Sequence, residues 1–192
     1  MRIAIFSGSF NPVHNGHLAI AHEVIAQGAA DELWFLVSPR NPLKLDTDLW
    51  PEEDRLMMVK LAIENVPGMV VSDFEFNLPR PSYTINTLNR LKERFPQHQF
   101  LLLIGGDNLS IFHKWLDYQK IITEFGLIVY PRPGFPIENF LLNPNITIVS
   151  APLIDISASF IRKKITAGEA IAAFVPFKVD SYIHENLNIF KL

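Results

Sequence analysis

The sequence predicts a doubly wound α/β fold, with a mainly parallel sheet that carries helices on both faces. Two observations lead to this prediction. Short segments of nearly continuous hydrophobicity alternate with longer segments whose apolar residues recur at helical spacing. Continuous hydrophobicity is typical of strands that are buried on both faces, as the strands of parallel sheets are. Regular alternation of the two kinds of segment indicates βαβ units.

Six segments are expected to be strands, because each is short, apolar and bounded by polar or turn-forming residues. They cover residues 3–6, 33–38, 69–74, 99–104, 126–130 and 146–150.

Six further segments are expected to be helices, namely residues 17–27, 51–64, 84–95, 109–124, 157–167 and 177–186. In the third of these, Ile85, Leu88, Leu91 and Phe95 recur at intervals that place them on one helical face. Gly28 is expected to terminate the first helix, and Pro51 is expected in the first turn of the second.

Length and composition lead us to expect one cytoplasmic globular domain covering residues 1–192. A net charge of −3 with 48% hydrophobic residues excludes a disordered chain, and it lacks the basic excess of a dedicated nucleic-acid binder. The absence of cysteine excludes disulfides, thiolate catalysis and cysteine-ligated metals. No targeting segment is recognisable, and no apolar run approaches the roughly 20 residues of a membrane helix. We therefore expect neither nucleic acid nor membrane as a partner.

Polar loops follow five of the predicted strands, at residues 7–17, 39–44, 105–108, 131–134 and 155–159. The carboxyl ends of parallel strands lie at one edge of a sheet, and ligands of open α/β sheets bind in the crevice outside that edge. The five loops are therefore expected to converge on one site.

The first loop offers Gly8, His14 and His17 to an anion. Gly8 has no Cβ to hinder a phosphate, and both imidazoles would lie near a helix N-terminus, where N–H groups and the dipole favour negative charge. Two alternatives remain open at this point. The histidines could lie on the surface of an ordinary turn, or they could bind a metal together with Asp107.

Lys44, Arg162 and Ser157 also have two interpretations each. Lys44 could bind phosphate or be a solvated loop residue. Cations close to the start of a helix are unfavourable unless an anion is bound there, so Arg162 indicates phosphate binding, although it could equally be solvated. Ser157 could contact phosphate or simply cap the helix.

Asp107 and Trp115 follow the fourth strand. Asp107 could accept hydrogen bonds from ribose hydroxyls, or it could be the N-cap of the next helix. Trp115 could stack on an aromatic ring of a ligand, or it could belong to the core.

Several catalytic signatures are missing from the sequence: it has no G-x-x-x-x-G-K-[ST], no G-x-G-x-x-G after the first strand and no G-x-S-x-G. The candidate residues bind phosphate well but include no obvious general base. This inventory suits a reaction whose nucleophile is already an anion, such as a phosphate attacking a phosphoanhydride.

Two segments resemble the signatures of a known superfamily. The run Gly8-Ser9-Phe10-Asn11-Pro12-Val13-His14-Asn15-Gly16-His17 resembles the loop of nucleotidyltransferases with a His-x-Gly-His motif, and Ile156-Ser157-Ala158-Ser159-Phe160-Ile161-Arg162 resembles their second signature. The resemblance is closest to the bacterial nicotinate-nucleotide adenylyltransferases, through residues 41–44, 82–88, 105–108, 112–115 and 132–134. It implies a Rossmann-like nucleotidyltransferase fold.

The resemblance also implies a reaction and a set of site residues. ATP and nicotinate mononucleotide would give nicotinate adenine dinucleotide (deamido-NAD) and pyrophosphate in NAD biosynthesis, with Mg²⁺ accompanying ATP and no protein residue assigned as a metal ligand. Catalysis is assigned to His14, His17, Lys44 and Arg162; binding of ATP to Gly8, Ser9, Phe10, Gly105, Asp107, Ile156, Ser157 and Ser159; binding of the mononucleotide to Thr84, Tyr83, Trp115 and Arg132.

The resemblance leaves three points open. A sister enzyme acting on nicotinamide mononucleotide or phosphopantetheine, and a nucleotide-binding module without turnover, are the alternative functions. Leu43, Asn86 and Ala158 depart from the family pattern, which puts a phosphate contact, a carboxylate role and one hydroxyl in doubt. The oligomeric state is also open, a homo-oligomer included.

Overall fold

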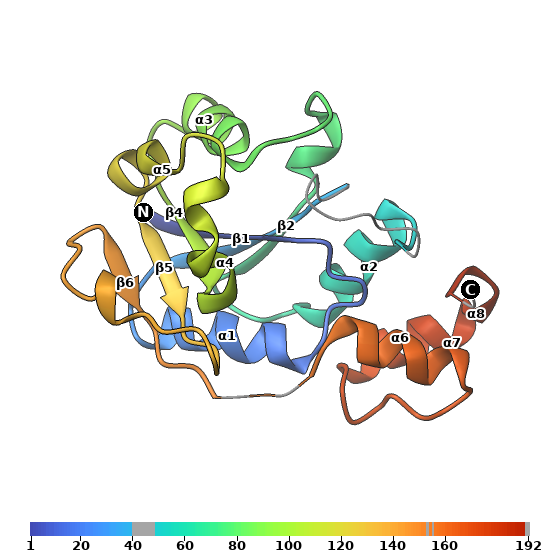
Figure 1. Cartoon of the computed structure of the whole chain (residues 1–192). Helices are drawn as coiled ribbons and strands as arrows, with labels where there is room; N and C mark the ends of the chain where they lie inside the picture. The colour runs from blue at the N-terminus through green and yellow to red at the C-terminus, as the bar shows by residue number, and fades with distance from the viewer. Residues whose placement is uncertain (40–48, 153, 155, 191–192) are drawn as a thin grey trace.

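The computed structural model describes residues 1–39, 49–152, 154 and 156–190, and it is built around one six-stranded sheet (Figure 1). The strand order is β3-β2-β1-β4-β5-β6, and every neighbouring pair is parallel. The strands are β1 (Arg2–Gly8), β2 (Glu32–Val37), β3 (Met69–Ser72), β4 (Gln99–Gly105), β5 (Leu127–Tyr130) and β6 (Ile146–Ile148). The predicted doubly wound parallel sheet is confirmed, and all six predicted strands are present with ends shifted by up to two residues.

The continuous hydrophobicity of the strands reflects two separate cores. In β1, Ile3 and Ile5 point into the core on one face of the sheet, whereas Ala4 and Phe6 point into the core on the other face. All four side chains are at most 6% exposed. A strand in this position needs apolar residues at every position, which is why its sequence does not alternate.

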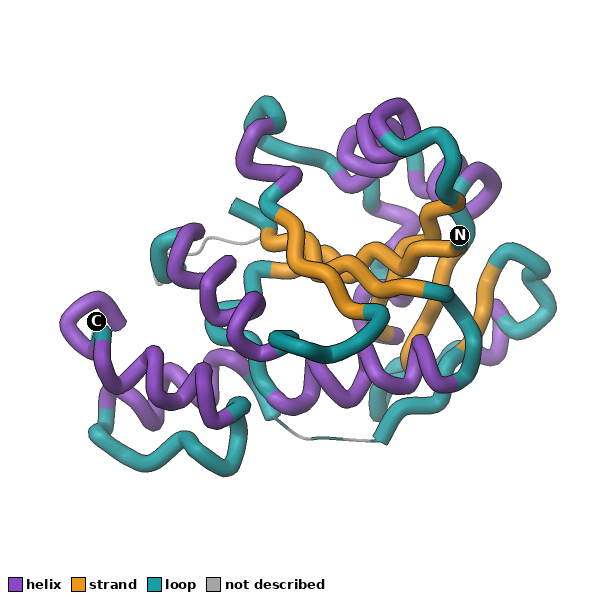
Figure 2. The backbone as a smooth tube through the Cα atoms, turned by 180° about the vertical axis from the view of Figure 1, so that it is seen from behind, coloured by secondary structure: helices purple, strands orange, loops and turns teal. Residues whose placement is uncertain are grey.

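Helices cover both faces of the sheet, as Figures 1 and 2 show from opposite sides. The helices α3, α4 and α5 pack on one face, and α1, α2, α6 and α7 contribute to the core of the other. The α-helices are α1 (Asn15–Ala26), α2 (Glu52–Ala62), α3 (Thr84–Arg94), α4 (Gly106–Ser110), α5 (Tyr118–Glu124), α6 (Ala158–Thr166), α7 (Phe177–Glu185) and α8 (Leu187–Phe190); the short 3₁₀ segments are η1 (Phe74–Asn77), η2 (Phe112–Lys114) and η3 (Glu138–Phe140).

The end of α1 follows its predicted signal. Gly28 has a φ of +65°, its N–H donates to the Ile25 carbonyl, and the N–H of Ala29 donates to the Val24 carbonyl. This is the Schellman arrangement, and it needs a residue without a Cβ at its left-handed position.

The single helix expected over residues 109–124 is wrong. The segment is divided into α4, η2 and α5, because Trp115 has extended backbone angles (φ −77°, ψ 145°) and Asp117 is left-handed (φ 51°). Neither conformation continues a helix. The break turns the chain at Trp115 so that its side chain reaches the cavity described below.

The C-terminal helices α7 and α8 pack against α2 and the residues that flank it. The Tyr182 hydroxyl donates to an Asp54 carboxylate oxygen at 2.6 Å, Lys178 pairs with Glu64, and the Trp50 and Phe190 rings lie 4.4 Å apart. Among the described residues, no helix is long and apolar enough to cross a membrane.

Candidate active site

A cavity of about 320 Å³ opens where the strand order reverses between β1 and β4. Connections from these two neighbouring strands leave on opposite faces of the sheet, which is how open α/β sheets form a crevice at the switch point. The carboxyl ends of β1 and β4 form its floor, with Gly8 and Gly105 among the lining residues, and Tyr83, Thr84 and Trp115 lie in its walls.

The predicted histidine pair lies beside this crevice, at the N-terminus of α1. His14 is the N-cap residue and is 6% exposed, and His17 follows in the first turn. The two rings stack with centroids 3.7 Å apart and planes 25° from parallel. The interpretation of the histidines as surface residues of an ordinary turn is therefore wrong.

The tautomer of His17 follows from one hydrogen bond. The backbone N–H of His14 donates to Nδ1 of His17 at 3.2 Å. Because a backbone amide is always the donor, this Nδ1 is unprotonated and the ring proton of neutral His17 is on Nε2. His17 therefore keeps one N–H donor for a ligand.

Both histidines are held neutral in the free site. Burial, and then the charge of Arg132, lowers the pKa of His14 from 6.5 to about 4. Burial is also the main cause that lowers the pKa of His17 well below 6.5, followed by the charges of His14 and Arg132. A bound anion would offset all of these effects, because it favours the protonated form.

Two glycines make the loop conformation possible. A Cβ on Gly16 would lie 3.1 Å from the His14 ring, and a Cβ on Gly8 would lie 3.1 Å from Cζ of Phe10. The Phe10 ring is 2% exposed, and the residue has a φ of 46°. Phe10 thus supports the loop from inside the core, and only its backbone is available to a nucleotide.

The loop after β4 places Asp107 against Arg132. Their Oδ1 and Nε atoms are 3.4 Å apart, and Nη2 of Arg132 donates to the Tyr130 hydroxyl at 3.1 Å. The N-cap of α4 is Gly105, so the interpretation of Asp107 as that N-cap is wrong. A Cβ on Gly105 would lie 2.3 Å from Oδ1 of Asp107, so any side chain at this position would displace the Asp107 carboxylate. Arg132 does not line the cavity but lies behind Tyr130, which does.

The second signature is connected to the first. The Ser157 hydroxyl accepts from the N–H of Phe160 at 3.2 Å, which confirms Ser157 as the N-cap of α6. Nη1 of Arg162 donates to the Asn11 carbonyl at 2.8 Å, and Nη2 lies 3.5 Å from Oγ of Ser159. The start of α6 is thereby fixed beside the first loop, although 151 residues separate Arg162 from Asn11.

Trp115 belongs to the core and also faces the cavity, so its stacking on a ligand ring stays a prediction. Its ring lies 5.1 Å from that of Phe112 and packs against the core, and it also lines the cavity. Thr84 is the first residue of α3, and Tyr83 is its N-cap. The N-terminal amides of α3 therefore start at the cavity wall.

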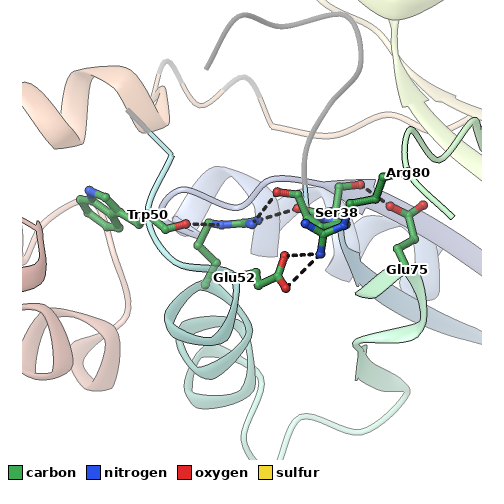
Figure 3. A network of polar contacts seen from close by, with 7 residues as sticks. Ser38, Trp50, Glu52, Glu75 and Arg80 are labelled. Carbon is green, nitrogen blue, oxygen red and sulfur yellow. Dashed lines mark hydrogen bonds and ion pairs between the residues drawn. The ribbon is translucent and has the colours of Figure 1, made fainter. Parts of the chain in front are cut away.

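Sequence reasoning missed Arg55, which is fully buried. Its guanidinium donates to the backbone carbonyls of Ser9, Ser38, Pro39 and Trp50 at 2.7 to 3.1 Å. Figure 3 labels two of these four residues, Ser38 and Trp50. It joins α2 to the ends of β1 and β2. A signal existed in the sequence, because Arg55 precedes the buried Met58 and Val59 by three and four residues and so shares their helical face.

Glu75 was missed as well. This residue of η1 lines the cavity at 4% exposure and accepts from Ser38 and Thr87. Burial raises its pKa, and the hydroxyl donors oppose that effect. A glutamate between Phe74 and Phe76 is the only sequence signal for its burial.

Lys44, with Leu43, lies outside the described residues. His14, His17 and Asp107 do not form a group that could hold a metal, and no other such group of three exists among the described residues, so the metal alternative is wrong.

The fold and the site together define an α/β protein with a crevice at the β1–β4 switch point, the place where open α/β sheets bind their ligands. The chain belongs to the cytidylyltransferase-like family, whose model matches residues 5–164, and within it to the nicotinate-nucleotide adenylyltransferases.

Relatives from several bacteria carry this name. The chain is 49% identical to a probable nicotinate-nucleotide adenylyltransferase of Bacteroides fragilis over 91% of this chain and 87% of the relative. It is 42% identical to one of Flavobacterium johnsoniae over 100% of both. A solved Plasmodium falciparum nicotinic acid mononucleotide adenylyltransferase, complexed with NaAD, has a similar fold (TM-score 0.81, 21% identity, 98% and 97% of the two chains covered).

Proposed function

We propose that this chain transfers the adenylyl group of ATP to nicotinate mononucleotide, giving nicotinate adenine dinucleotide and pyrophosphate in cytoplasmic NAD biosynthesis. One observation carries the proposal: the histidine loop and the Trp115 cavity flank the same strand end, where Gly8 and Ser9 join them. Residues 1–192 act as one nucleotidyltransferase domain.

The reaction is an in-line displacement at the α-phosphorus of ATP. A phosphate oxygen of the mononucleotide forms the new P–O bond, and the bond to the β-phosphate bridging oxygen breaks, releasing pyrophosphate. The attacking oxygen is already anionic, so no general base is needed, and the protein contributes mainly positioning and charge stabilisation.

The first loop and the start of α6 bind the ATP phosphates. His17 donates through Nε2, and His14 contributes its ring beside it. Ser9 and the backbone of Phe10 also belong to the loop that binds phosphate. The N-terminus of α6 binds phosphate through Ile156, Ser157 and Ser159. Arg162, whose guanidinium orders Asn11, and Lys44 supply the positive charge.

Asp107, with the backbone of Gly105, binds nucleotide sugar hydroxyls, and Arg132 holds Asp107 in place. The pyridine ring lies in the cavity against Trp115, near the N-terminal amides of α3 at Thr84, with Tyr83 supporting that turn.

The divalent metal that accompanies this family's chemistry fits as a companion of ATP. The described residues offer no cluster of three metal-ligating side chains, and Mg²⁺ is commonly held mostly by substrate phosphates and water. We propose Mg²⁺ as that ion; it neutralises charge on the phosphates when bound.

Pyrophosphate release from Mg·ATP tests the proposal, with nicotinate mononucleotide, nicotinamide mononucleotide and phosphopantetheine compared in parallel. Turnover at least tenfold more efficient with the first is expected. A preference for either of the other two acceptors would identify the chain as a sister enzyme with the same fold. Binding of ATP without turnover of any acceptor would identify a binding module.

A further inference from the structure

The wall of the cavity contains a buried carboxylate that no described cation pairs with. Glu75 accepts from Oγ of Ser38 at 2.6 Å and from Oγ1 of Thr87 at 3.0 Å (Figure 3 shows the first contact). Among the described residues, no lysine, arginine or histidine forms an ion pair with Glu75. A buried carboxylate without a counter-ion is costly, so it favours a cationic ligand beside it.

The directions of the hydrogen bonds around Glu75 support its ionised form. Oε2 of Glu75 accepts the proton of the Ser38 hydroxyl, which lies 3.1 Å from the Ser7 hydroxyl. Burial raises the pKa of Glu75, and a hydrogen bond from Ser7 also acts to lower it. Oε1 accepts the proton of Thr87. Both carboxylate oxygens are acceptors, which stabilises the anion.

A cation lies on another wall of the same cavity. Lys114, the last residue of η2, lines the cavity next to Trp115 and is exposed at its rim. Glu75 is the acidic residue among the lining residues, and Lys114 is the basic one. The cavity is therefore polarised, with its negative group buried and its positive group at the solvent side.

We propose that this polarity selects the acceptor by the charges of its ring: Glu75 favours a cationic aromatic ring, and Lys114 favours an anionic substituent on it. The inference rests on the proposed function and deepens it. In nicotinate mononucleotide the glycosidic bond makes the ring nitrogen a quaternary, positively charged pyridinium, and the carboxylate on the ring is negative. The cavity and this zwitterionic ring have complementary charges.

Three acceptors separate the two charges of the ring. Nicotinate mononucleotide carries both; nicotinamide mononucleotide keeps the ring cation and loses the carboxylate; the C-nucleotide with a 3-carboxyphenyl ring keeps the carboxylate and loses the cation. Ratios of kcat/KM between the first acceptor and each of the others report the two preferences separately. A ratio within one variant cancels effects that are common to all acceptors.

Glu75→Gln and Lys114→Gln are each expected to change one ratio. Glu75→Gln should reduce the preference for pyridinium over phenyl about tenfold, the scale of one charge interaction in a partly desolvated site, and should leave the preference for acid over amide within about twofold. Lys114→Gln should do the reverse, with a smaller loss of about threefold because Lys114 is solvated. Glu53→Gln, which removes an exposed carboxylate of α2, should change neither.

The inference is overturned if Glu75→Gln keeps the wild-type pyridinium preference, or if it lowers both ratios equally. Should Glu75→Gln fail to fold, Glu75→Ala is compared with acetate and with acetamide in the assay. Acetate should restore the preference, and rescue by neither or by both equally contradicts the role of the charge. The proposed function fails separately, if the wild-type protein does not turn over nicotinate mononucleotide at all.

Discussion

His14 and His17 show how burial prepares a side chain to bind a polyphosphate. Their pKa values are lowered in the free site, so at neutral pH they are hydrogen-bond donors without charge. Charge that builds on the transferred phosphate would strengthen the Nε2–H contact of His17, since hydrogen bonds to an ionised acceptor are stronger. Interactions that strengthen in the transition state raise kcat.

His17→Ala is therefore expected to lower kcat by about 10²- to 10³-fold, the usual effect of removing one donor to a developing oxyanion, and to weaken ATP binding less than tenfold. Steady-state kinetics and calorimetric ATP binding measure the two effects. His22→Ala, on the exposed face of α1, is the matched control. Equal losses in kcat and ATP affinity would refute a transition-state role.

The lowered pKa of His14 also makes the stability of the free protein depend on pH. Below pH 6.5 the unfolded chain takes up a proton that folded His14 does not accept until about pH 4. The free energy of unfolding is therefore unaffected by His14 above pH 6.5. As the pH decreases from 6.5 toward 4, it falls by up to about 3 kcal/mol because of this residue. Urea unfolding at several pH values should show this slope, and His14→Gln should reduce it. An unchanged slope in the variant would assign the acid sensitivity to other groups.

Trp115 combines core packing with a position in the cavity, so its variants need two readouts. Trp115→Ala is expected to raise KM for nicotinate mononucleotide about 10- to 100-fold through lost stacking and packing, and to change KM for ATP little. Trp115→Phe should recover most of the loss. If KM for the mononucleotide does not change, Trp115 serves only the core.

At the scale of the element, the site is made at junctions between strands and helices. β1 passes into α1 through the histidine loop, and β4 passes directly into α4 at Gly105. Side chains approach the backbone closely at both junctions, and a glycine at each (Gly8 and Gly105) leaves room for them. The two arginines Arg55 and Arg162 then hold the first loop through its carbonyls at Ser9 and Asn11.

Gly105→Ala tests the second junction. The new Cβ would lie 2.3 Å from Oδ1 of Asp107 and 2.9 Å from Cζ of Tyr130, so Asp107 must move away from Arg132. We expect a loss of about 1–3 kcal/mol in unfolding free energy and a rise in KM for both substrates. Gly106→Ala, whose Cβ would lie 3.3 Å from the Arg132 nitrogen, should have a smaller effect. The reverse order of the two variants would contradict this account of the junction.

At the scale of the whole molecule, the C-terminal helices stabilise the first loop indirectly. Tyr182 on α7 donates to Asp54 on α2, and the next residue of α2, Arg55, organises the ends of β1 and β2. Burial, together with the Asp54 contact, raises the pKa of Tyr182 from 10 to about 12. A tyrosine with a raised pKa stabilises the fold at neutral pH and loses this contribution as the pH rises from 10 toward 12.

Tyr182→Phe is expected to lower the unfolding free energy by about 1 kcal/mol at neutral pH, the typical value of one hydrogen bond. Its difference from wild type should shrink when the pH is raised above 10. Tyr118→Phe, whose hydroxyl only accepts from Gln119 at 3.4 Å, is the comparison. A difference between Tyr182→Phe and wild type that does not depend on pH would show that the hydroxyl contributes packing alone.

The sequence by itself determined the strands, the sheet class and the histidine loop. Strands that are buried on both faces must be apolar at every position, so their sequence alone identifies them. His14 and His17 are close together along the chain, so the local sequence was enough to predict that they share one loop. The tertiary structure alone decided the break at Asp117, since a left-handed residue leaves the apolar spacing of the segment intact. It also decided the roles of Arg55 and Glu75, because a polar side chain can be buried only where partners distant in sequence satisfy it, and Ser9, Ser38 and Thr87 meet them only in the fold.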